Sequence, residues 1–129
     1  MVKLPMPPEH VEAVRFMQMV RLHRNKYPAL DNLLAIPNGG DRHAAVAAKM
    51  KGEGVSPGYP DYALDWPAQG FHGLRIELKR QKFAPSDVSD KQRTWHERLR
   101  KAGYRVEVAG GWEAAWKIVC EYMEIPHGA

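Results

Sequence analysis

Three side chains in the middle of the sequence have the chemistry of a hydrolytic site: the carboxylates of Asp61 and Glu77 and the ammonium of Lys79. Asp61 ends the turn-rich segment GYPD, and Glu77 and Lys79 belong to the segment RIELK at 75–79. Apolar and polar residues alternate from Leu74 to Lys79, which is the period of a half-buried strand. Glu77 and Lys79 are therefore expected on one face of that strand.

A second alternating run lies just upstream, from Asp61 to Trp66, and a turn-rich segment at 67–73 separates it from the first. Two such runs joined by a turn predict a β-hairpin. If the register of the hairpin places Asp61 opposite Glu77 or Lys79, the three side chains project from one face of the sheet.

Two carboxylates and an ammonium crowded on a sheet face are costly unless a ligand uses them, because like charges repel and a divalent cation removes the repulsion. Mg²⁺ and Mn²⁺ prefer oxygen ligands, so Asp61, Glu77 and the backbone carbonyl of Leu78 are candidate ligands for one or two ions. Lys79 would orient or deprotonate an attacking water, or stabilise charge on a phosphate. The alternative is a turn residue at Asp61 and an ordinary surface pair of Glu77 and Lys79.

Four motifs follow one another along the chain: Gly54, Val55, Gly58, Pro60 and Asp61; the segment IELK at 76–79; the spaced residues Ser89, Gln92 and Trp95; and the pair Gly103 and Tyr104. In this order they resemble the VRR-NUC domain, the virus-type replication-repair branch of the PD-(D/E)XK nucleases. The resemblance extends from about Glu9 to Tyr122. It implies a restriction-endonuclease-like core, divalent-metal-dependent phosphodiester hydrolysis and, for small stand-alone viral and bacterial members, action on branched DNA as homodimers.

The resemblance also implies a supporting carboxylate near the start of the first helix. In the family a glutamate at this place assists the metal site, and the match puts Glu9 in that role, with Glu12 as the competitor one turn later. A family glutamine usually follows four residues after this glutamate, where this chain has Ala13. The alternative is that Glu9 is a first-turn glutamate favoured by the helix dipole.

A glutamine is expected on the buried side of a later helix. This helix is predicted from Ser86 or Ser89 to about Ala102, closed by Gly103, and Gln92 completes the spacing of its apolar stripe. A buried amide needs a partner. In the family the glutamine lies beside the lysine and the attacking water, and the alternative is that Gln92 caps a backbone group. The other members of the stripe are Val88, Trp95, Leu99 and Ala102.

Positive charge gathers around the proposed site. The net charge is only +4, but residues 75–105 hold ten Lys and Arg against four Asp and Glu. A phosphate backbone is the obvious partner, since binding releases its condensed counterions. The alternative is a solvated helix face. The candidate DNA contacts are Asn38, in an Asn-Gly turn that family members carry beside the active site, and Arg42, Arg80, Lys82, Lys91 and Arg93. For Asn38 the alternative is a plain turn without a substrate contact.

The length and the spacing of apolar residues predict one domain, residues 1–129, of the α/β class, with a mixed sheet flanked by helices. Helices are expected over about 9–27, 44–50, 89–102 and 112–123, and strands over 33–36, 61–66, 74–79 and 104–108. Trp112 and Trp116 lie at helical spacing on the last helix, where core packing is expected and a dimer interface is the alternative.

Several classes of protein are excluded. The chain has no apolar run that could span a membrane and no signal peptide, so a cytoplasmic location is expected, in a bacterial host if the protein is encoded by a phage. A single cysteine, Cys120, excludes an intramolecular disulfide and is expected to pack on the last helix. The absence of a P-loop or dinucleotide fingerprint argues against a nucleotide cofactor.

The predicted function is therefore a divalent-metal-dependent endodeoxyribonuclease, acting as a homodimer on branched DNA such as four-way (Holliday) junctions. Asp61, Glu77 and Lys79 would carry the reaction, with Gln92 and Glu9 in support. Two alternatives stay open at this point. One is a basic DNA-binding protein of the same fold that has lost catalysis, and the other is a nuclease that acts on flaps, linear DNA or RNA.

Overall fold

The computed structural model describes residues 5–37 and 44–127. Within these ranges the chain forms four α-helices, two short 3₁₀ helices and four strands. In chain order they are α1 (Glu9–His23), η1 (Pro28–Asn32), β1 (Leu33–Ala35), α2 (Ala44–Gly52), β2 (Tyr62–Leu64), β3 (Leu74–Lys79), η2 (Pro85–Asp87), α3 (Asp90–Lys101), β4 (Arg105–Gly110) and α4 (Trp112–Met123).

The strands form one mixed sheet in the order β1-β2-β3-β4. The pairs β1–β2 and β2–β3 are antiparallel, whereas β3 and β4 are parallel. Parallel neighbours need a crossover connection, and α3 supplies it between β3 and β4. The mixed sheet flanked by helices that the sequence predicts is confirmed.

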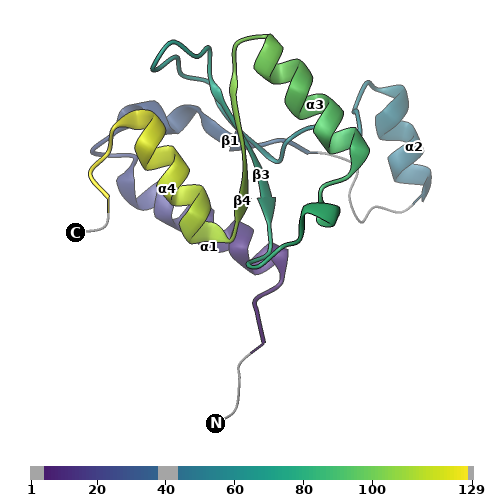
Figure 1. Ribbon diagram of the computed structural model, residues 1–129, viewed down its shortest axis with the longest axis horizontal. Helices are drawn as coiled ribbons and strands as arrows, with labels where there is room; N and C mark the ends of the chain where they lie inside the picture. Colours follow the sequence, from purple (N-terminus) through teal and green to yellow (C-terminus); the bar gives the residue numbers. More distant parts are fainter. Residues whose placement is uncertain (1–4, 38–43, 128–129) are drawn as a thin grey trace.

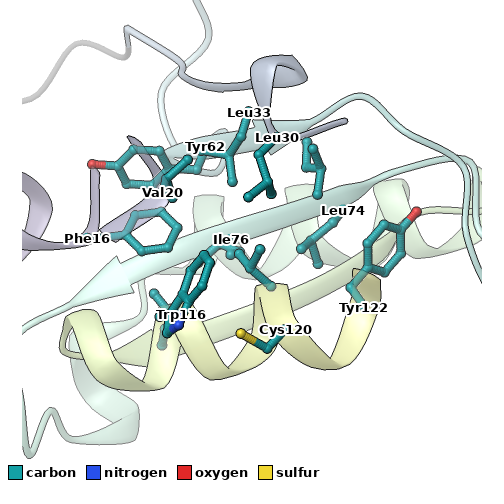
Figure 2. Packing of buried hydrophobic residues seen from close by; sticks show 14 of the residues in the cluster. Phe16, Val20, Leu30, Leu33, Tyr62, Leu74, Ile76, Trp116, Cys120 and Tyr122 are labelled. Carbon is teal, nitrogen blue, oxygen red and sulfur yellow. The ribbon is translucent and has the colours of Figure 1, made fainter. Parts of the chain in front are cut away.

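Helices α1 and α4 pack together on one face of the sheet, and α3 lies on the other (Figure 1). Phe16 and Val20 of α1 and Trp116 and Cys120 of α4 meet Ile76 of β3 in the main apolar cluster (Figure 2). Each such buried side chain stabilises the fold by roughly 1.5–3 kcal/mol relative to exposure. The packing of Cys120 and Trp116 in the core follows the prediction, and Trp112 packs against the same cluster.

Strand β3 is buried on both faces, whereas the alternation of its residues predicts a half-buried strand. Glu77 is 1% exposed and Arg75 is 7% exposed. The reason is its central place, because β2 and β4 flank β3. Residues of α1 and α4 pack against Ile76 on one face (Figure 2), and His96 of α3 contacts Glu77 on the other. Arg75 is satisfied there by the Tyr59 hydroxyl at 2.9 Å and by Asp65 at 3.2 Å.

The ends of several elements differ from expectation; strand β4, for instance, runs to Gly110 rather than to residue 108. Helix α1 ends at His23, although the amide of Tyr27 still donates to the His23 carbonyl at 2.9 Å. Strand β2 stops at Leu64 and leaves Trp66 43% exposed, because Pro67 follows and cannot donate to a ladder. Ala102, predicted on the buried stripe of α3, is exposed at the helix end.

Helix α2 lies beyond α3, apart from the sheet, and buries none of its residues (Figure 1). The described residues contain no helix long and apolar enough to cross a membrane.

Candidate active site

The hairpin brings Asp61 to Glu77. Tyr62 pairs with Ile76 in the β2–β3 ladder, so the next position on each strand joins Asp61 and Glu77. The Asp61 carboxylate is fixed by the backbone amide of Leu78, which donates to Oδ2 at 2.8 Å. This register is one of the two that the sequence predicts, and it places both carboxyl groups on one face of the sheet.

The Asp61 turn is pressed against the start of α3. Gly58 has a φ of +89°, and a Cβ at this position would lie 2.8 Å from the backbone carbonyl carbon of Lys91. Only glycine combines the positive φ with this close approach of two backbones. The turn that delivers Asp61 is therefore held against α3 as well as against the hairpin.

Glu77 is a buried carboxyl group with two partners. Its Oε1 lies 3.2 Å from Nε2 of His96, and the side chains of both residues are almost fully buried. Burial, a hydrogen bond with the Asp61 side chain and the charge of Asp61 raise the pKa of Glu77 from 4.5 to about 9, against the opposing effect of Lys79. A nearby cation would favour the charged form of this crowded pair.

His96 is a site residue that the sequence reasoning missed. Burial and then the charges of Arg100 and Lys79 lower the pKa of the imidazole. The lowered pKa favours the neutral ring, in which the contact with Glu77 is a hydrogen bond rather than an ion pair. The sequence contains a pattern that is compatible with this position, because His96 follows Gln92 by four residues and precedes Leu99 by three, which is helical spacing. The prediction gave that place on the stripe to Trp95, which is only partly buried.

The partner of Lys79 is Gln92, whose Oε1 accepts from the Lys79 ammonium at 3.1 Å. The same Oε1 accepts from the backbone amide of Ser89 at 2.9 Å, and the Ser89 hydroxyl accepts from the Gln92 amide. Ser89 and Gln92 thus form a capping box that starts α3. Both alternatives considered for Gln92, a lysine partner and a helix cap, hold in the structure.

Of the two candidate glutamates of α1, Glu9 is the one beside the site. A cavity of about 530 Å³ is lined by Glu9 together with Asp61, Lys79 and Gln92. The charge of Glu9 also contributes to the raised pKa of Glu77. Glu12 is fully buried elsewhere, where its Oε2 accepts from the side-chain amide of Gln81 at 3.3 Å and a Cβ on Gly111 would approach it to 2.7 Å.

The donor set fits a hard divalent cation. In residues 5–37 and 44–127 no three His, Cys, Asp or Glu side chains converge as a complete metal cage. What converges is the crowded carboxyl pair of Asp61 and Glu77, next to the backbone of Leu78. Mg²⁺ commonly takes one or two carboxylates and keeps water and phosphate oxygens for its other positions, and Mn²⁺ prefers the same oxygen ligands. Such a pair suits these ions better than zinc, which takes sulfur and nitrogen donors.

The candidate DNA contacts that the structure describes are all exposed. Arg80 and Lys82 lie on the connection after β3, and Lys91 and Arg93 lie in the first turn of α3. Arg93 is partly engaged, since it donates to the carbonyl of Pro85 at 2.7 Å. The other two candidates, Asn38 and Arg42, lie outside the described residues.

Comparison with known proteins identifies the family. The sequence profile of the VRR-NUC domain matches residues 13–113. The chain belongs to the VRR-NUC family. A solved structure described as a VRR_NUC domain protein is 28% identical and superposes with a TM-score of 0.77, covering 95% of this chain and 93% of that chain. No curated protein matches the chain. Membership in VRR-NUC makes this a nuclease-type domain with a role in processing DNA.

Proposed function

We propose that the protein is a divalent-metal-dependent endodeoxyribonuclease, with Asp61, Glu77 and Lys79 at its reacting centre. The observation that carries the proposal is the joint geometry of these groups. Glu77 is buried against Asp61 on the sheet, and Lys79, two residues along the same strand, is held by Gln92 at 3.1 Å. A fold has no structural need for two carboxyl groups crowded in this way.

The side chains of Asp61 and Glu77 and the backbone carbonyl of Leu78 would hold Mg²⁺ or Mn²⁺, and Glu9 would support the site from the cavity wall. When bound, such an ion supplies Lewis-acid polarisation of a phosphoryl oxygen and lowers the pKa of water. The amide of Leu78 fixes the Asp61 carboxylate, which supports this role. Placing the donors in advance avoids reorganisation at the moment of reaction.

Lys79 would act on the attacking water or on the phosphate. Its ammonium has three donors, and one of them is used by Gln92. The other donors can orient the water or stabilise the charge that develops on phosphorus-bound oxygens, and the amine form could accept the proton of the water. Hydrolysis would be an in-line displacement at phosphorus, in which positioning supplies most of the catalysis.

The proposed substrate is branched DNA, for instance a four-way junction, and the proposed assembly is a homodimer. A two-fold dimer would present two equal sites to the two strands that a junction resolvase must cut. The exposed basic residues after β3 and on α3 would bind the phosphates beside each site.

A cleavage panel tests the proposal. Purified protein is incubated with labelled four-way junctions, flaps, linear duplex, single-stranded DNA and RNA, with Mg²⁺, Mn²⁺ or EDTA, beside Asp61→Ala and Lys79→Ala. We expect metal-dependent cutting of the junction that is lost in both variants, and a dimer by light scattering. Preference for flaps, linear DNA or RNA would keep the chemistry and overturn the junction assignment. DNA binding without any cleavage would overturn the nuclease and favour the non-catalytic DNA-binding protein.

A further inference from the structure

One turn of α3 supports two neighbouring side chains on β3. Gln92 contacts Lys79 at 3.1 Å, and His96 contacts Glu77 at 3.2 Å. Four residues of α-helix advance about 6 Å, and two residues of a strand advance about 6.6 Å. The two spacings match. The later helix residue, His96, contacts the earlier strand residue, Glu77, because α3 runs antiparallel to β3. This direction of α3 lets β4 run parallel to β3 (Figure 1).

Each member of the reacting centre has a hydrogen-bond partner of its own. Asp61 has the amide of Leu78, and Lys79 has the amide oxygen of Gln92. Glu77 hydrogen-bonds with the Asp61 side chain within the centre, and its partner from outside the centre is His96, which lies in the buried layer between the sheet and α3. A glutamate has three side-chain torsions, so a buried carboxylate needs such a partner to present its oxygens in one direction.

We infer that His96 is a positioning residue, which donates Nε2–H to Oε1 of Glu77 and holds this carboxylate in the orientation that binds the divalent cation. The inference rests on the proposed metal site, and it concerns affinity for the cation rather than the reaction itself. Groups that orient the ligands of a metal in this way commonly contribute about 10–100-fold to metal affinity or activity.

A pair of matched variants separates positioning from packing. His96→Gln keeps an N–H donor at similar reach, and His96→Met has nearly the same length and volume without a donor. A packing control comes from the next turn of α3, where Leu99 is buried and contributes no hydrogen bond to the site, so Leu99→Ala lowers stability alone.

The first readout is direct binding of Mn²⁺, followed by electron paramagnetic resonance of the free ion, with thermal unfolding in EDTA as the measure of folding. We expect His96→Met to weaken Mn²⁺ binding by about 10–100-fold, His96→Gln to recover most of the loss, and Leu99→Ala to keep the wild-type affinity. Equal affinity in His96→Met and wild type would overturn the inference, as would equal losses in the Gln and Met variants. Absence of Mn²⁺ binding by the wild-type protein would also overturn it.

Cleavage gives the second readout and keeps the two proposals distinguishable. The Mg²⁺ concentration for half-maximal cleavage should rise in His96→Met, and the rate at saturating Mg²⁺ should change far less. If the wild type binds Mn²⁺ through His96-dependent geometry but cuts no substrate, the proposed function fails and the positioning role stands. If cleavage depends on metal equally in all variants, the positioning role fails and the proposed function stands.

Discussion

The Lys79 ammonium donates to the side-chain oxygen of Gln92 at 3.1 Å, across 13 positions of sequence. Because the same oxygen also accepts from the Ser89 amide at 2.9 Å, one atom both caps α3 and holds the candidate catalytic lysine. A substitution at Gln92 therefore acts on stability and on the site together, and the two effects need separate measurement.

Replacing Gln92 should cost more activity than its role as a helix cap explains. Gln92→Ala removes both hydrogen bonds, and we expect about 1 kcal/mol lower stability and a cleavage rate lowered by about tenfold to a hundredfold through misplacement of Lys79. Ser89→Ala is the matched control, since it removes the cap and leaves the Lys79 contact. Equal rates in the two variants would show that Gln92 serves only the helix. Single-turnover cleavage and urea unfolding provide the two measurements.

Lys79 should be needed for the reaction and not for the fold. The side chain of Lys79 is partly buried, and within the described residues the one hydrogen bond recorded for its ammonium goes to Gln92. Lys79→Ala should therefore keep the unfolding temperature within a few degrees. The cleavage rate should fall by roughly 10²–10⁴, the range for a lost proton-transfer group. Lys82→Ala removes an exposed lysine three residues later and should change the rate by less than about tenfold, with a weaker salt dependence of DNA binding. Comparable losses in both would make Lys79 a DNA contact.

The stability of the metal-free protein should fall as the pH rises. The pKa of Glu77 is raised from 4.5 to about 9, so in this range the folded protein holds a proton that the unfolded chain has released. The unfolding free energy then decreases with pH, with a limiting slope of about 1.4 kcal/mol per pH unit.

The useful window for this measurement is pH 6.5 to 9. Below it the lowered pKa of His96 gives the opposite slope, since the unfolded chain binds the extra proton there. Above it Cys120 adds a decrease of its own, because burial raises the pKa of its thiol from 9.0 to about 11 and the unfolded chain releases this proton first. Glu77→Gln should flatten the decrease in EDTA. An unchanged slope in Glu77→Gln would mean that another group holds the proton.

Substitution of Glu9 and substitution of Glu12, the two glutamates of α1, should have different effects on cleavage and on stability. Glu9→Ala removes an exposed carboxylate from the cavity wall and should lower the cleavage rate without lowering the unfolding temperature. Glu12→Ala empties a fully buried position beside Gln81 and should lower stability by roughly 1–3 kcal/mol while folded protein keeps its rate. The reverse pattern would make Glu12 the supporting carboxylate.

Gly58 should tolerate no side chain. Gly58→Ala adds a Cβ that would meet the backbone of Lys91 at 2.8 Å, in addition to the strain of a φ of +89°. Gly54→Ala carries similar strain at a φ of +98° in open space. We expect Gly54→Ala to cost about 1 kcal/mol and Gly58→Ala to cost clearly more and to slow cleavage by displacing Asp61. Equal effects in the two variants would mean that the turn can move away from α3. Differential scanning calorimetry and the cleavage assay supply the comparison.

The sequence predicted the parts of the site that depend on local patterns. The hairpin follows from two alternating runs and a turn, whereas the choice of Glu77 over Lys79 as the residue opposite Asp61 comes from the register in the structure. The start of α3 lies at Ser89, one of the two serines that the sequence offers, and Gln92 completes its capping box. These features are encoded within a few residues of one another, where spacing rules are reliable.

The parts that depend on contacts far apart in sequence were not predicted. Burial of Glu77 on β3 requires β4 and α3, which the alternation within β3 cannot report. Helical spacing admits both Trp95 and His96 on the inner side of α3, so spacing alone does not choose between them, and only the packing of α3 on the sheet brings His96 to Glu77.

The contact between Gly58 and Lys91 also limits how this site can change over evolutionary time or be reused in design. Since the Asp61 turn and the first turn of α3 touch through their backbones, neither can shift without the other. Grafting only the two carboxylates and the lysine onto another sheet would leave out the surface against which they are aligned. A graft that keeps this alignment must carry at least the hairpin together with α3, and homologues should vary these two segments jointly.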